Sequence, residues 1–147
     1  MKPHMTYQDI GYIKDGCLFV QDVPSPRTGI QISFTTPSNM AFEIVSMRTS
    51  LSCTGAGLDR LPVASAFALN RRYWDCPSAL PIATGLELNL TWAEGLANIS
   101  DIDFSHGIPF SRMILPPATT IEISAVNLLV TDAFGPLVVV AIAYPLK

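Results

Sequence analysis

Proline and glycine interrupt this sequence so often that long helices have little room to form. The 147 residues include 12 prolines and 9 glycines, spread over most of the chain. A proline inside a helix removes a backbone hydrogen bond and clashes with the preceding turn. The segments between these breaks are short and rich in β-branched residues, a pattern typical of a β-sandwich or barrel. We therefore predict one all-β domain, built as an antiparallel β-sandwich.

The clearest strand signal lies at residues 86–92, where apolar and polar residues alternate strictly. A period of two is typical of a strand with one buried face and one wet face. The side chains expected to point into the core are those of Leu86, Leu88, Leu90 and Trp92.

Other segments show weaker strand signals. Residues 61–69 could form a helix or a strand, and residues 93–98 a helical turn or a loop. A short turn at residues 132–136 favours an antiparallel hairpin between the last two strands. The remaining predicted strands cover residues 30–34, 40–53, 119–131 and 137–144.

Two of these strands allow a prediction about faces. In residues 40–53, strict alternation puts Met47 and Leu51 on one face and Phe42 and Ile44 on the other. Residues 137–144 are apolar on both faces. Such a strand is either central in a sandwich or buried at a subunit contact.

The first part of the chain has no regular pattern apart from a short apolar run at residues 17–20. Pro24 and Pro26 both disfavour helix in the residue before them. We therefore expect residues 1–28 to form an extended N-terminal arm that reaches beyond its own domain. The β-sandwich domain is expected to cover residues 29–147.

The chain is unusually apolar. Apolar residues make up 49% of the sequence and charged residues 14%, against about 25% charged residues in a typical soluble domain. The longest apolar stretch, residues 136–146, is about half of the roughly 20 residues that a membrane-spanning helix needs. Residues 1–9 are polar and show no signal peptide. We therefore expect no membrane partner, and assign the apolar excess to protein–protein contact in a homo-oligomer, with a trimer favoured.

Charge and motifs give little support for chemistry. The net charge is −3 and no basic run exists, so a nucleic-acid partner is not expected. No nucleophile elbow, phosphate loop or zinc-protease motif is present. The sequence therefore predicts no catalytic residue and no cofactor.

One histidine could belong to a metal site. His106 follows Asp101 and Asp103 closely, and these three side chains could form a ligand cluster. The alternative is a loop in which both aspartates form turns and the histidine lies on the surface. We favour the loop and expect no metal.

Carboxylates and thiols have equally plain interpretations. Glu43, Glu87 and Glu122 alternate with apolar neighbours, so we expect a solvated sheet face rather than a glycosidase pair. The three cysteines have no zinc-binding spacing and are expected to be free, buried thiols. A Cys53–Cys76 disulfide is the alternative.

The segment richest in recognition residues is the run Arg71, Arg72, Tyr73 and Trp74. Arginine, tyrosine and tryptophan are enriched at the energetic centres of protein interfaces. We interpret these four residues as a candidate protein-contact site. Two alternatives stay open: the aromatic rings could cover one end of the core beside solvated arginines, or the group could bind a ligand.

Late in the chain, residues 112–123 read RMILPPATTIEI, after a proline-punctuated arm and a series of short strands. With this layout, a small, apolar, acidic and cysteine-poor β-domain resembles the jelly-roll or β-sandwich accessory proteins of tailed-bacteriophage virions, such as capsid decoration or cement proteins. The resemblance covers the layout of the whole chain and assigns no functional residue. It implies jelly-roll-like connections and assembly in several copies on a capsid or tail.

Together these features predict a non-enzymatic virion protein that stabilises the particle through self-association and contacts with coat proteins. It would be made in the host cytoplasm, not secreted, and located in the virion. Two alternatives belong to other classes. A sugar- or peptide-binding sandwich would have a pocket with Trp74 or Trp92 near acidic residues. A cupin-like enzyme would have a metal site centred on His106.

Overall fold

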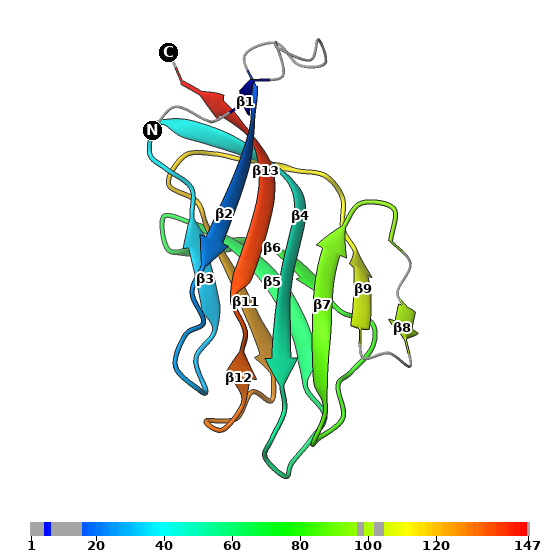
Figure 1. Ribbon diagram of the computed structural model, residues 1–147. Helices are drawn as coiled ribbons and strands as arrows, with labels where there is room; N and C mark the ends of the chain where they lie inside the picture. The colour runs from blue at the N-terminus through cyan, green and yellow to red at the C-terminus, as the bar shows by residue number, and fades with distance from the viewer. Residues whose placement is uncertain (1–4, 7–15, 97–98, 102–104, 147) are drawn as a thin grey trace.

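Two β-sheets packed face to face make up the fold (Figure 1). The computed structural model describes residues 5–6, 16–96, 99–101 and 105–146. Within these residues there is no helix, and one nine-stranded and one four-stranded sheet account for the strands. The prediction of an all-β sandwich is therefore confirmed. The jelly-roll-like connection stays a prediction.

The larger sheet lies in front in Figure 1, and β13 and β4 lie near its middle. Its central part is antiparallel, as predicted, whereas β7 and β9 near one edge pair in parallel. The strands, in their order across the sheet, are β1 (Met5–Thr6), β2 (Cys17–Val23), β13 (Leu137–Pro145), β4 (Met40–Ser52), β7 (Glu87–Ala93), β9 (Ser105–Pro109) and β8 (Ile99–Asp101), while β10 (Ile114–Leu115) and β12 (Ala133–Phe134) pair with β4.

The smaller sheet lies behind the larger one (Figure 1) and is antiparallel throughout. The ambiguous segment at residues 61–69 forms one of its strands, not a helix. The two edges of this sheet are its first and last strands in the order β3 (Ile32–Thr35), β11 (Thr120–Val126), β5 (Leu61–Ala68) and β6 (Arg71–Pro77).

The core lies between the two sheets and contains most of the side chains that the alternation at residues 86–92 singled out. Leu88, Leu90 and Trp92 are buried, as predicted. Leu86 is 37% exposed, so the prediction for this residue is wrong. The reason is that β7 begins at Glu87, after a turn in which Gly85 has a φ of +80°. Leu86 therefore lies at the end of the sandwich rather than between its sheets.

A β-bulge in β4 corrects the predicted faces of that strand. The register between β4 and β13 skips Val45, which is the extra residue. A bulge shifts the alternation of side chains by one position. Phe42 and Ile44 before the bulge, and Met47 and Leu51 after it, consequently all point into the same core. The prediction that these pairs lie on opposite faces is wrong.

Strand β2 lies inside the region predicted to be an arm. It pairs with β13 over its whole length, and Cys17 is buried. The apolar run at residues 17–20 lets this segment extend the sheet, so residues 17–23 belong to the sandwich and not to an arm. Residues 24–28 contain no strand, and residues 1–4 and 7–15 of the predicted arm lie outside the described residues.

Strand β13 is central in the larger sheet, between β2 and β4. Its inward side chains belong to the core, whereas Val138 and Val140 on its outer face are only partly buried. The predicted hairpin between the last two strands is wrong, because β11 belongs to the smaller sheet. β11 ends at Val126, and Asn127 has a φ of +64° that turns the chain out of the strand. The short β12 then pairs with β4 before β13 begins.

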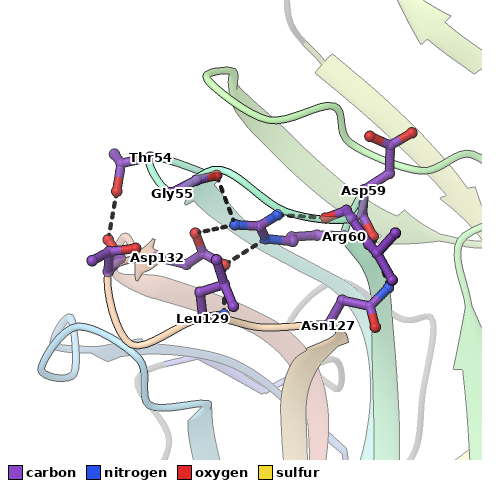
Figure 2. A network of polar contacts seen from close by, with 9 residues as sticks. Thr54, Gly55, Asp59, Arg60, Asn127, Leu129 and Asp132 are labelled. Carbon is purple, nitrogen blue, oxygen red and sulfur yellow. Dashed lines mark hydrogen bonds and ion pairs between the residues drawn. The ribbon is translucent and has the colours of Figure 1, made fainter.

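A buried ion pair holds two loops together at one end of the sandwich (Figure 2). The Arg60 guanidinium donates to both carboxylate oxygens of Asp132, from Nε at 2.7 Å and from Nη2 at 3.0 Å. Arg60 also donates to the carbonyls of Gly55 and Leu58, and Asp132 accepts from the backbone amide of Leu129. Because the charges are paired and hydrogen-bonded, both side chains can be fully buried.

Candidate contact surface on the β5–β6 hairpin

The hairpin of β5 and β6 positions the predicted contact residues. Its connection is the two-residue turn Leu69–Asn70, in which both residues have positive φ, 50° and 59°. Two-residue hairpin turns of this kind favour asparagine and glycine, because other side chains clash with the backbone there. Asn70 fits this rule and Leu69 does not. The Leu69 side chain is moreover 95% exposed, so no contact within the domain compensates for the strain.

Three of the four predicted residues follow this turn and are exposed. Arg71, Arg72 and Tyr73 begin β6, the edge strand of the smaller sheet. The register with β5 skips Tyr73, which is the extra residue of a β-bulge, and its side chain is 49% exposed. Bulges and charges are common on edge strands because they discourage uncontrolled strand pairing. The hairpin therefore offers its side chains, rather than a flat strand edge, for contact.

Trp74 does not belong to this exposed group. Its ring is half-buried against the core and meets Phe110 edge-on, with ring centroids 6.2 Å apart. This arrangement matches the alternative considered for the sequence, in which the tryptophan ring covers one end of the core. The structure thus brings together Arg71, Arg72 and Tyr73, and places Trp74 on the inward side.

Arg72 is held in place while Arg71 is not. The Arg72 guanidinium lies 5.3 Å from the centroid of the Phe67 ring, and its Nε is 3.6 Å from a carboxylate oxygen of Asp75. Asp75 in turn accepts a hydrogen bond of 2.6 Å from Ser65. Arg71 makes no ion pair with any other residue in the part of the chain that the structure describes. One fixed and one available guanidinium therefore follow the turn on β6.

Sequence reasoning missed Leu69, the most exposed large apolar residue of the hairpin. Once residues 61–69 are known to be a strand, Asn70 indicates a hairpin turn. A leucine directly before it is then unusual, because that turn position disfavours leucine. The helix alternative for this segment hid that signal.

His106 is not a surface loop residue, so the favoured interpretation of that segment is wrong. It lies in β9 and is buried, on the same face of the strand as the core residue Ile108. Burial lowers the pKa of its imidazole. Of the two aspartates considered as alternative ligands beside it, Asp103 and the side chain of Asp101 lie outside the described residues. Among the residues the structure describes, no three ligand-type side chains gather as a metal site.

The other residues weighed for chemistry lie apart from one another. Trp92 is fully buried, and its indole donates to the Cys76 carbonyl at 3.3 Å, so it lines no ligand pocket. Glu122 belongs to the smaller sheet, whereas Glu43 and Glu87 belong to the larger one. Glu43 is bound by Arg112 at 2.9 Å. Glu87 pairs with Ser52 at the end of β4, whereas Glu43 lies near the start of that strand, so these two carboxylates are also far apart.

No disulfide joins the three cysteines, all of which lie among the described residues, so the alternative Cys53–Cys76 bridge does not form. Cys17 and Cys53 are buried and Cys76 is half-buried. Burial, together with the nearby carboxylate of Asp132, raises the pKa of the Cys53 thiol to about 11. Cys53 is therefore protonated at neutral pH and a poor nucleophile.

Comparison of the chain with protein-family models, curated proteins and solved structures finds no match. Among the described residues, no helix has the length and apolar character to cross a membrane.

Proposed function

We propose that this protein is a non-enzymatic structural protein of a virion, of the capsid decoration or cement kind, which binds further copies of itself and coat proteins. The sandwich fold, the apolar composition and the exposed hairpin support this proposal. The hairpin residues Leu69, Arg71, Arg72 and Tyr73 are the proposed contact with other particle proteins.

The observation that carries the proposal is the exposed, strained leucine at the hairpin tip. A left-handed conformation costs a residue such as Leu69 roughly 1–2 kcal/mol. The isolated domain recovers none of this, because the side chain lies almost wholly in solvent. A partner with an apolar pocket would bury the leucine and bind the flanking Arg71 and Tyr73, a combination typical of interface centres. Strain at an exposed apolar residue is thus explained by contact with another protein.

The proposal is tested by sedimenting the purified protein together with particles of the virus whose genome encodes it. Wild-type protein should sediment with the particles. Leu69→Asn should lose most of this binding, because asparagine suits the turn but removes the apolar side chain. Asn70→Gly is the matched control: it also suits the turn, keeps Leu69, and should bind like wild type. Failure of wild-type protein to sediment with particles, or equal binding by Leu69→Asn, would overturn the proposal.

A further inference from the structure

The outer face of the larger sheet has an apolar centre. On β13, the side chains of Leu137, Val139 and Ala141 belong to the core. Since side chains alternate along a strand, Val138 and Val140 project from the opposite face. Val140 pairs with Val20 of β2, whose side chain is 56% exposed.

Two opposite charges flank this centre in a single row across three strands. Val138 pairs with Asp22 of β2 on one side and with Arg48 of β4 on the other. Adjacent strands are about 4.8 Å apart, which separates the two charged residues by about 10 Å. Both side chains are exposed, and neither makes an ion pair with another described residue. This row thus presents one acid and one base, with a valine between them.

A shallow hollow of about 470 Å³ lies beside Arg48 on this face. Polar side chains form much of its lining, among them Ser50, Asn89 and Thr91. Hydroxyl and amide groups can donate hydrogen bonds to a carboxylate, and an arginine beside them adds a charge-assisted bond. The hollow therefore suits the carboxylate of an aspartate from a second molecule.

We propose that a second copy of this chain packs on this face, related by a two-fold axis that runs along β13. Rotation by half a turn about that axis leaves Val138 in place along the strand and exchanges the positions of Asp22 and Arg48 on either side of it. Val138 then meets Val138 of the second copy, and each Asp22 comes opposite Arg48 of the other copy. Stacked sheets lie about 10 Å apart, a gap that a long arginine and a short aspartate can close together.

The same rotation makes the contact self-complementary, as a two-fold interface must be. Val138 and Val140 of each copy form the dry centre of the contact. An identical ion pair between Asp22 and Arg48 lies on each side of that centre. This inference rests on the self-association in the proposed function and identifies the face that performs it. It concerns a pairing of two copies, whereas the trimer expected from the sequence stays a separate prediction.

The experiment uses two charge reversals, Asp22→Arg and Arg48→Asp, each in the full chain. Each variant alone would face like charges across the axis twice, so the pairing should weaken at least tenfold. A mixture of the two variants restores both attractive contacts in every mixed pair. Sedimentation should therefore show monomers for each variant alone and dimers of one Asp22→Arg chain with one Arg48→Asp chain after mixing. Arg27→Asp, an exposed arginine on a loop outside this face, is the control and should pair like wild type.

The outcomes separate this inference from the proposed function. Wild-type protein that is monomeric, or variants that pair as well as wild type, would overturn the two-fold contact. So would folded single variants that stay monomeric after mixing. Binding of wild type to particles, and its loss in Leu69→Asn, is measured independently and judges the proposed function alone.

Discussion

Arg60 and Asp132 form a bidentate, fully buried ion pair across 72 positions of sequence, with contacts of 2.7 and 3.0 Å (Figure 2). The pair joins the loop between β4 and β5 to the loop between β11 and β12, and each of these loops connects one sheet to the other. Removal of one partner leaves the other charge buried without compensation. The resulting loss of stability is far larger than the net stabilisation that the intact pair provides.

We therefore expect Asp132→Ala to lower the free energy of unfolding by about 3–5 kcal/mol. The measurement is urea unfolding followed by tryptophan fluorescence, at one fixed protein concentration. Asp59→Ala is the matched control, because that carboxylate is exposed, and it should change stability by less than about 0.5 kcal/mol. Equal stability of the two variants would show that the ion pair does not hold the loops.

The same pair predicts an acid dependence of stability. Burial alone raises the pKa of the Asp132 carboxyl, but hydrogen bonds from Arg60 and from the Leu129 amide, with the guanidinium charge, outweigh burial and bring it below the ordinary value. A carboxyl with a lowered pKa in the folded state stabilises the protein above its unfolded pKa of about 3.9. This stability is lost as pH falls through the lower, folded value. Wild type should thus lose more stability than Asp132→Ala between pH 5 and pH 2, and parallel unfolding curves would contradict this.

Two leucines near the start of the predicted strand at residues 86–92 supply a matched pair of variants, one in the core and one outside it. Leu88 is buried between the sheets and Leu86 is exposed at the end of the sandwich. Leu88→Ala should cost about 2–5 kcal/mol in unfolding free energy, the range for a buried leucine. Leu86→Ala should cost clearly less. A loss below about 0.5 kcal/mol for Leu88→Ala would show that this residue is not a core residue.

The same comparison shows what the sequence can predict. Side-chain periodicity predicts which residues of β7 are buried, because a half-buried strand imposes a period of two on its sequence. It fails at Leu86, because the strand boundary depends on a turn at Gly85. It fails again at β4, because the extra residue Val45 breaks the period without any local signal. Its failure at residues 17–23 has another cause: these residues become a strand by pairing with β13, more than 100 positions later.

The exposure of the proposed contact residues was predictable in part. Arginine and tyrosine in sequence marked Arg71, Arg72 and Tyr73, which the structure exposes on one edge strand. Composition could not separate Trp74 from them, and alternation alone would put Trp74 on the same face as Arg72. Trp74 points inward because the extra residue Tyr73 shifts the alternation in β6 by one position. The row of Asp22, Val138 and Arg48 was beyond prediction, because it joins three strands that are distant in sequence.

The strain at the hairpin tip predicts a stabilising variant. Leu69→Asn should raise the free energy of unfolding by about 1 kcal/mol, because asparagine tolerates the left-handed conformation that leucine resists. Thermal unfolding monitored by circular dichroism at fixed protein concentration measures this change. A destabilised Leu69→Asn variant would mean that the leucine contributes to the fold, which would remove the main reason to assign it to a partner contact.

The central claim is that this chain works by association with copies of itself and with other proteins. Analytical ultracentrifugation of the wild-type protein over a range of micromolar concentrations tests self-association most directly. We expect a species whose mass is a multiple of 15.9 kDa and whose share grows with concentration. A single species of 15.9 kDa at every concentration would contradict it.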